Sequence, residues 1–293
     1  MRLVLHIGAH GTDDGLIAGY LAQNRAALQG QGVLAPSPRA FVRRLSDVLD
    51  RERDADPRAR EEALLRSFGA SGQRRWLAVS APGLLGPVTD ILQPEGFYSR
   101  DVARRMLALR TLFPRCALTI LLAVRAPSGF LPAILPLPDS GDTDAIGERL
   151  GALGTETLPW GQLVAALRRH LPGARFVVWR HEHLSRVWPR VLSELIGAGR
   201  GVPGAGLEAF TALGLSAEAA VRLRHYLAAN PPRGAAQLAA TAEVFGRRFG
   251  RAPVRDMAAA YPGWMREQFA RLDQGYMTEW ADIASQQGVD ALH

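Results

Sequence analysis

The sequence predicts an α/β fold with a doubly wound, mostly parallel sheet, followed by a helical C-terminal extension. Apolar runs of strand length lie at residues 3–7, 76–80, 117–124 and 175–179, and amphipathic segments of helical length separate them. Such alternation is typical of a parallel sheet that is covered by helices on both faces. We therefore expect these four strands in one sheet.

The elements up to residue 124 follow from the spacing of apolar residues, glycine and proline. The first strand leads through a glycine-containing loop into a helix from about Asp14 to Gly30 or Gly32, where glycine favours a stop. The pattern then predicts a short strand at 33–36, helices at 39–49 and 58–68, the strand at 76–80, a helix at 100–113 capped by Ser99, and the strand at 117–124. The last of these is a continuous apolar run, which is typical of a central strand buried on both faces.

The second half predicts two parts. Residues 136–158 form a surface excursion around a short helix at about 143–150, and a helix at 160–171, the strand at 175–179 and a helix ending near residue 196 follow. Residues 197–206 contain six glycines or prolines, which suit neither a helix nor a strand, so they mark a boundary. We expect an α/β domain at 1–198 and a helical extension at 199–293, with helices at 216–229, 236–249 and 264–283.

The amino-acid composition limits the classes of protein to which the chain can belong. With 293 residues, 47% of them hydrophobic and 22% charged, the chain is typical of a globular protein. No apolar run reaches the roughly 20 residues of a membrane span, and the N-terminus lacks a charged segment followed by a long apolar one, so we expect a cytoplasmic protein without membrane association. The net charge is +7, but the arginines are dispersed among acids, which argues against nucleic-acid binding.

All 35 basic residues are arginine. The sequence therefore excludes a lysine-based phosphate loop, a lysine Schiff base and a lysine general base. The single cysteine, Cys116, cannot form an internal disulfide and is expected to pack as a small hydrophobe beside the strand that begins at Ala117.

The loop after the first strand carries the clearest functional pattern. Free N–H groups and the positive end of a helix dipole meet at such a strand–loop–helix junction, which suits an anion. Residues 6–15 (HIGAHGTDDG) resemble the phosphosulfate loop of the sulfotransferase family, which reads approximately K-[ST]-G-[ST]-[ST] after a lead such as HIGAH. The lead is intact here, but the lysine is missing and only Thr12 keeps the register.

A second resemblance to the same family follows the strand at 117–124. Arg125 and Pro127 match an Arg-x-Pro motif, whereas Ala133 stands at the position of the family's serine. Arg125 could contact a 3′-phosphate through two hydrogen bonds, or a neighbouring carboxylate could hold it at the strand end. The sequence leaves both alternatives open.

The resemblance implies a P-loop-like fold and a transferase activity. Sulfotransferases move a sulfuryl group from 3′-phosphoadenosine 5′-phosphosulfate to a hydroxyl or amine, here of a small molecule or glycan. The residues that the resemblance assigns to this cofactor are Gly8, His10, Gly11, Thr12, Arg125 and Ser128, and His6 and His10 are the candidate bases. No carboxylate follows Ser80, where the family often has one.

Two carboxylates argue against an ordinary phosphate loop. Asp13 and Asp14 stand where the phosphate would be held, and each unit charge repels it by about 1 kcal/mol at 4 Å in water. Either carboxylate could instead cap the following helix. We therefore expect a sulfotransferase-like protein with weakened or lost activity, and the alternative is a non-catalytic binding or assembly protein on the same scaffold; whether the chain is an enzyme stays open.

The sequence His181-Glu182-His183 could place two metal ligands on one side of an extended segment. Structural zinc needs four protein ligands, and no cysteine or histidine nearby in sequence completes the set. We expect no metal here, and we expect these residues to start the next helix.

Overall fold

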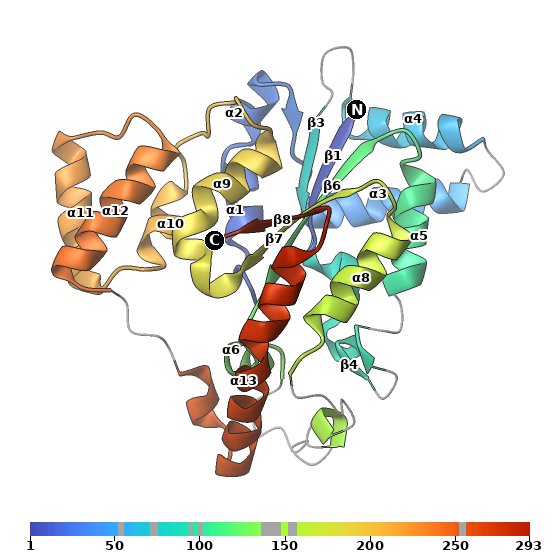
Figure 1. The fold of residues 1–293 in the computed structure, drawn as a ribbon. Helices are drawn as coiled ribbons and strands as arrows, with labels where there is room; N and C mark the ends of the chain where they lie inside the picture. Colours follow the sequence, from blue (N-terminus) through green and yellow to red (C-terminus); the bar gives the residue numbers. More distant parts are fainter. Residues whose placement is uncertain are drawn as a thin grey trace.

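The computed structural model describes residues 1–51, 56–70, 76–93, 96–98, 102–135, 148–151, 157–251 and 256–293. Within these residues the main sheet has six strands in the order β2-β3-β1-β6-β7-β8, and every neighbouring pair is parallel (Figure 1). The strands are β1 (Arg2–His6), β2 (Val33–Leu34), β3 (Trp76–Ser80), β6 (Ala117–Val124), β7 (Arg175–Arg180) and β8 (Val289–Leu292). The four strands expected in one sheet are all present in it, which confirms the α/β prediction.

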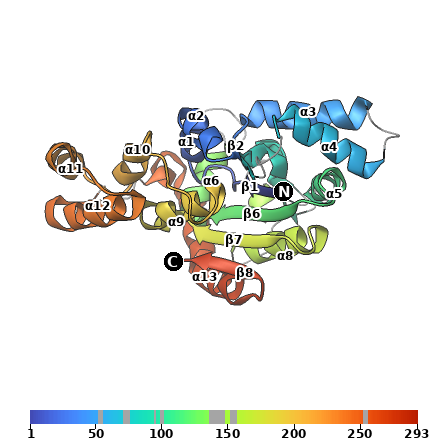
Figure 2. The same ribbon diagram turned by 90° about the horizontal axis from the view of Figure 1, so that it is seen from above.

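Helices cover both faces of the sheet (Figure 2). Side chains alternate between the faces along each strand, so Leu3 and Leu5 belong to one buried cluster and Val4 to the other. The cluster of Leu3 includes α3 (Pro38–Arg51), α4 (Pro57–Ser67), α5 (Val102–Leu112), α6 (Pro127–Ile134), α8 (Trp160–His170) and α13 (Gly263–Ser285). The cluster of Val4 includes α1 (Leu16–Gln23), α2 (Arg25–Gly30), α9 (Leu184–Ile196), α10 (Leu207–Ala212) and the start of α12 (Ala235–Phe249).

The helix expected from residue 14 to residue 30 is two helices. Asn24 separates α1 from α2, and its side-chain amide donates to the carbonyl oxygens of Tyr20, at 2.9 Å, and Ala205, at 2.8 Å. The glycine-rich segment 197–206 thus binds the break in the helix. This local effect of a distant segment explains why helical periodicity alone predicted one continuous helix.

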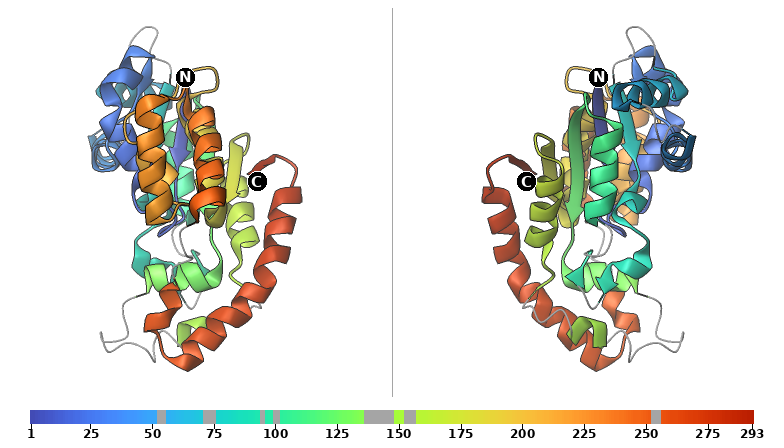
Figure 3. Two further views of the ribbon diagram at one scale, coloured as in Figure 1. Left: turned by 90° about the vertical axis from the view of Figure 1, so that its left-hand side faces the viewer. Right: turned by 90° about the vertical axis from the view of Figure 1, so that its right-hand side faces the viewer.

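The C-terminal segment corrects a second expectation. The pattern predicts only helices beyond residue 206, but β8 pairs with β7 as the edge strand of the main sheet, and α13 packs against α6 and α8. Figure 3 shows α13 along one side of the molecule, leading to the C-terminus. The division at residue 199 stays a prediction, and the last 31 residues complete the core and sheet of the first part.

The remaining elements are small or lie at the margin. The sequence did not predict the antiparallel pair β4 (Leu92–Gln93) and β5 (Gly96–Phe97). The Ser99 cap and most of the helix expected at 143–150 lie outside the described residues.

Helices α11 (Ala217–Ala229) and α12 form a pair beside α9 and α10, at the left of Figure 1. No helix in the described part of the chain is long and apolar enough to cross a membrane.

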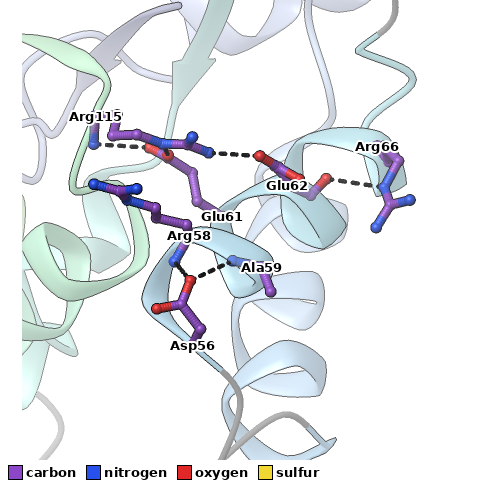
Figure 4. A network of polar contacts seen from close by, with 7 residues as sticks. All are labelled: Asp56, Arg58, Ala59, Glu61, Glu62, Arg66 and Arg115. Atoms are coloured by element: carbon purple, nitrogen blue, oxygen red, sulfur yellow. Dashed lines mark hydrogen bonds and ion pairs between the residues drawn. The ribbon is translucent and has the colours of Figure 1, made fainter.

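A buried carboxylate joins α4 to the turn before β6 (Figure 4). Glu61 is 1% exposed and accepts hydrogen bonds from the backbone N of Arg115, at 3.0 Å, and from its Nε, at 2.6 Å. Glu62 contacts the same guanidinium from the surface. Burial raises the pKa of the neighbouring Cys116 thiol to about 12, so Cys116 stays protonated and packs against the core as expected.

Candidate functional site

The candidate site lies at the carboxyl ends of β1 and β6. The chain leaves β1 toward β2 on one side of the sheet and leaves β6 toward β7 on the other. In open α/β sheets the crevice at such a switch in strand order is the usual ligand position. The loop at residues 7–15, the segment 125–128 and the turn 181–183 meet at this point through the hydrogen bonds given below.

His6 is fully buried at the base of this crevice. Its Nδ1 lies 2.8 Å from Ser80 Oγ and 4.0 Å from Asp13 Oδ2, and its ring stacks on Trp179 at a centroid distance of 5.8 Å. A relay from a carboxylate through histidine to a nucleophile uses the two ring nitrogens separately, whereas Ser80 and Asp13 both face Nδ1. Burial lowers the pKa of His6, so the ring is neutral, and its buried Nε2 has no hydrogen-bond partner among the described residues.

His10 is the more accessible of the two candidate bases. Its Nδ1 lies 3.0 Å from the Tyr98 hydroxyl, and the two rings stack at a centroid distance of 5.9 Å. Burial lowers the pKa of His10, which leaves a neutral imidazole at neutral pH. A neutral imidazole can accept a proton, so His10 keeps the chemistry of a base.

The loop between β1 and α1 uses its polar groups internally. The Thr12 hydroxyl donates to the carbonyl oxygen of Ala9 at 2.6 Å, and Thr12 is fully buried. Gly8 and Gly11 have φ values of 108° and 61°, which favour glycine. A side chain at Gly11 would also meet the Cβ of Ala133 at 2.8 Å, so the two motifs identified in the sequence lie directly against each other.

Asp13 fills the N-terminus of α1. Its Oδ1 accepts from the backbone N of Gly15 at 3.3 Å and its Oδ2 from that of Ile17 at 3.1 Å, and the carboxylate is 6% exposed. These are the N–H groups that an anion at this helix terminus would use. The prediction that at least one of the two aspartates accepts backbone N–H groups at the helix start is confirmed for Asp13, which does so from two positions before the N-cap residue Gly15.

Arg125 also contacts the loop between β1 and α1. Its Nη1 donates to the carbonyl oxygen of Gly11, and its own carbonyl oxygen accepts from Trp160 Nε1 at 3.1 Å. Burial lowers the pKa of the guanidinium, while the charges of Glu182 and Asp14 oppose that shift. These contacts do not decide between the two alternatives for Arg125, because its guanidinium bonds a carbonyl oxygen while Glu182 and Asp14 act on it through their charges.

Carboxylates also occupy the N-terminus of α6. Glu182 Oε1 accepts from the backbone N of Ala126 at 2.8 Å, and Asp273 Oδ1 accepts from that of Ser128 at 2.9 Å. The Tyr276 hydroxyl donates to Glu182 Oε2 at 3.1 Å, and Asp273 and Tyr276 both come from α13. The backbone N of Ser128 is thus bonded within the protein.

The two histidines at 181 and 183 bind different groups. They lie in the short helix η4 (His181–His183), as expected for the start of α9, and His181 Nδ1 contacts the carbonyl oxygen of Thr12 while His183 Nε2 contacts Arg180. Burial lowers the pKa of His181, and burial together with Arg180 lowers that of His183 to about 4. Among the described residues, no group of three or more metal-ligating side chains is placed to hold an ion.

Sequence reasoning brought most of these residues together and missed three. Tyr98, Asp273 and Tyr276 carry no recognisable motif, and Asp273 is 145 positions from its partner Ser128. Only the recurrence of apolar residues every three or four positions along α13 could have indicated that one face of this helix packs against the rest of the protein.

Comparison of the chain with family models, curated proteins and solved structures gives no match. The fold and the site define the chain as an α/β protein. Its described part has a six-stranded parallel sheet, and the candidate site lies at the switch in strand order.

Proposed function

We propose that the chain is a sulfotransferase-like protein in which sulfuryl transfer is lost and the scaffold serves as a non-catalytic binding or assembly protein. One observation carries this proposal: the protein's own carboxylates accept the N–H groups at the starts of both α1 and α6. These are the two termini to which the family resemblance assigns the phosphates of the cofactor.

The residues present do not fit 3′-phosphoadenosine 5′-phosphosulfate. The phosphosulfate would have to replace Asp13, and the 3′-phosphate would have to replace Glu182 and Asp273. A unit charge 4 Å away repels an anion by about 1 kcal/mol in water and by about 4 kcal/mol at an effective dielectric constant of 20. No lysine in the chain offsets this repulsion, and Arg125 already donates to Gly11.

The candidate bases do not restore the activity. Group transfer needs a base next to the acceptor and donors around the departing phosphate. His6 is fully buried among Ser80 and Trp179. His10 is the imidazole that an acceptor molecule could reach. Without a bound sulfuryl donor, however, there is no group to transfer to that acceptor.

Calorimetry with 3′-phosphoadenosine 5′-phosphate at neutral pH tests the proposal. We expect no binding tighter than about 100 μM, because losing two charge-assisted hydrogen bonds of about 1.5–3 kcal/mol each weakens binding by more than 100-fold. A micromolar dissociation constant that Arg125→Ala abolishes would overturn the proposal and favour a nucleotide-dependent enzyme. Micromolar binding that Arg125→Ala leaves unchanged would also overturn it and would place the nucleotide elsewhere.

A gain of binding tests the stated reason. In the double variant Glu182→Gln, Asp273→Asn, both side chains keep an oxygen for their N–H partners but lose their charge. We expect this variant to bind 3′-phosphoadenosine 5′-phosphate at least tenfold more tightly than the natural chain, since each removed repulsion amounts to about 1 kcal/mol or more. The matched control is Asp282→Asn, an exposed residue of the same helix α13. Equal affinities for the double variant and the control would contradict the role of the carboxylates.

A further inference from the structure

Helices α11 and α12 form an open groove of about 790 Å³ away from the switch point. Both helices lie at the left edge of Figure 1 and face the viewer in the left panel of Figure 3. Tyr226, Val244, Phe245 and Phe249 give the groove an aromatic and aliphatic lining.

The lining has the dimensions of a helix-binding surface. On α12 the contributing residues are 237, 240, 241, 244, 245, 248 and 249, which recur at spacings of three and four positions and so form one stripe. Thirteen residues of helix extend about 20 Å, or between three and four turns. A groove between two antiparallel helices with such a stripe matches the recognition mode in which an amphipathic helix places its apolar face between two others.

The apolar side chains of the groove are unusually exposed. Tyr226 is 45% and Val244 is 53% exposed, although apolar side chains of this size usually gain about 1.5–3 kcal/mol from burial. Phe245 lies 5.4 Å from both Tyr226 and Phe249, measured between ring centroids. This forms a continuous row of rings, and such a patch is typical of an interaction site.

Two arginines mark one end of this row. The guanidinium of Arg222 lies 4.7 Å from the centroid of Phe249, and that of Arg248 lies 5.4 Å from it. Glu218 pairs with Arg222, but within the described residues no carboxylate lies in ion-pair contact with Arg248. In the described part of the chain, the groove lining contains Arg222 and Arg248 and no carboxylate, so the groove carries an excess of positive charge.

We infer that the α11–α12 groove docks an acidic amphipathic helix of a partner protein. The apolar face of that helix covers Tyr226, Val244 and Phe245, and its carboxylates meet Arg222 and Arg248. A second copy of this chain fits less well, because a symmetric contact would bring the same arginines face to face. A membrane also fits less well, since a flat bilayer leaves a concave groove unfilled.

Fluorescence anisotropy with a labelled probe tests the inference on the full chain. The probe is a 14-residue helical peptide with leucines at positions i, i+3, i+7 and i+10 and glutamates on the flanks, and its matched control has lysine in place of each glutamate. We expect the acidic peptide to bind at least tenfold more tightly than the basic one, with an affinity that falls as salt rises.

Variants locate the site. Val244→Asp and Arg248→Glu should each weaken binding of the acidic peptide at least tenfold. Their matched controls on α5, Leu107→Asp and Arg110→Glu, change equally exposed residues outside the groove and should leave it unchanged.

Three outcomes would overturn the inference. The first is equal binding of the acidic and basic peptides. The second is sedimentation with phosphatidylglycerol vesicles that Arg248→Glu abolishes while neither peptide binds, which would identify a lipid surface. The third is a concentration-dependent dimer that Val244→Asp abolishes, which would identify a second copy. The groove shares no residue with the switch point, so this test and the nucleotide test can fail separately.

Discussion

Replacement of Asp13 should measure how much the helix cap contributes to stability. Asp13→Ala removes both acceptors of the Gly15 and Ile17 N–H groups, and loss of a side chain that accepts such groups at a helix start costs about 0.5–2 kcal/mol. The two hydrogen bonds, at 3.3 and 3.1 Å, are long for N–H···O contacts, and His6, 4.0 Å away, is neutral because burial lowers its pKa. We therefore expect a loss of about 1 kcal/mol, with no large ion-pair contribution.

Chemical denaturation at neutral pH gives this free energy directly, and the melting temperature should fall by about 2–4 °C. Asp13→Asn should retain most of the stability, because asparagine caps a helix about as well as aspartate. Asp14→Asn removes the neighbouring charge without touching the cap, and we expect a change within about 0.5 kcal/mol. An Asp13→Ala chain as stable as the natural one would refute the self-capping described here.

Three further predictions concern the core and the loop. Burial lowers the pKa of His6, so as the pH falls below about 6.5 the unfolded chain binds the proton before the folded chain does. The stability that His6 contributes is therefore present above that pH and is lost below it, by up to about 1.4 kcal/mol per pH unit. His6→Gln should flatten the dependence of the unfolding free energy on pH between about pH 6.5 and 5, and an unchanged slope would contradict this account. Gly11→Ala should destabilise the chain by about 1–3 kcal/mol, because it adds a side chain at positive φ. That side chain would lie 2.8 Å from Ala133, so Ala133→Gly should recover part of the loss in a denaturation experiment, and no recovery would exclude the clash. Glu61→Ala should lower the midpoint of thermal unfolding by more than Glu62→Ala, since only Glu61 is buried, and equal shifts would contradict a role for the buried carboxylate.

The sequence determined the centre of the sheet because its strands are continuous apolar runs. The continuous apolar run at residues 117–124 indicated a strand buried on both faces, and the spacing of apolar residues after the loop that follows residues 3–7 indicated a helix. The capping role of Asp13 was also predictable, because it depends on residues within four positions of it. These features share short-range causes.

The features that the sequence did not predict depend on contacts between segments that are far apart in the chain. The strand β8 has four residues and includes Asp290, whose partner Arg175 is on β7, so no local periodicity distinguishes it from a chain end. One of the two carboxylates at the N-terminus of α6 comes from α13, and the break at Asn24 depends on Ala205. Partners so far apart in sequence leave no local pattern of apolar and polar residues that would identify the pair.

The position of α13 and β8 has a consequence for the order in which this chain can fold. During synthesis the first five strands of the sheet emerge before residue 181, but β7 keeps an open edge and α6 keeps an unpaired Ser128 N–H until residues 263–292 have left the ribosome. Contacts of such large sequence separation form slowly, and an unpaired strand edge exposes the nascent chain to association with other chains. Docking of the last segment is therefore the closing step of folding, after which both the open side of β7 and the N-terminus of α6 have their partners.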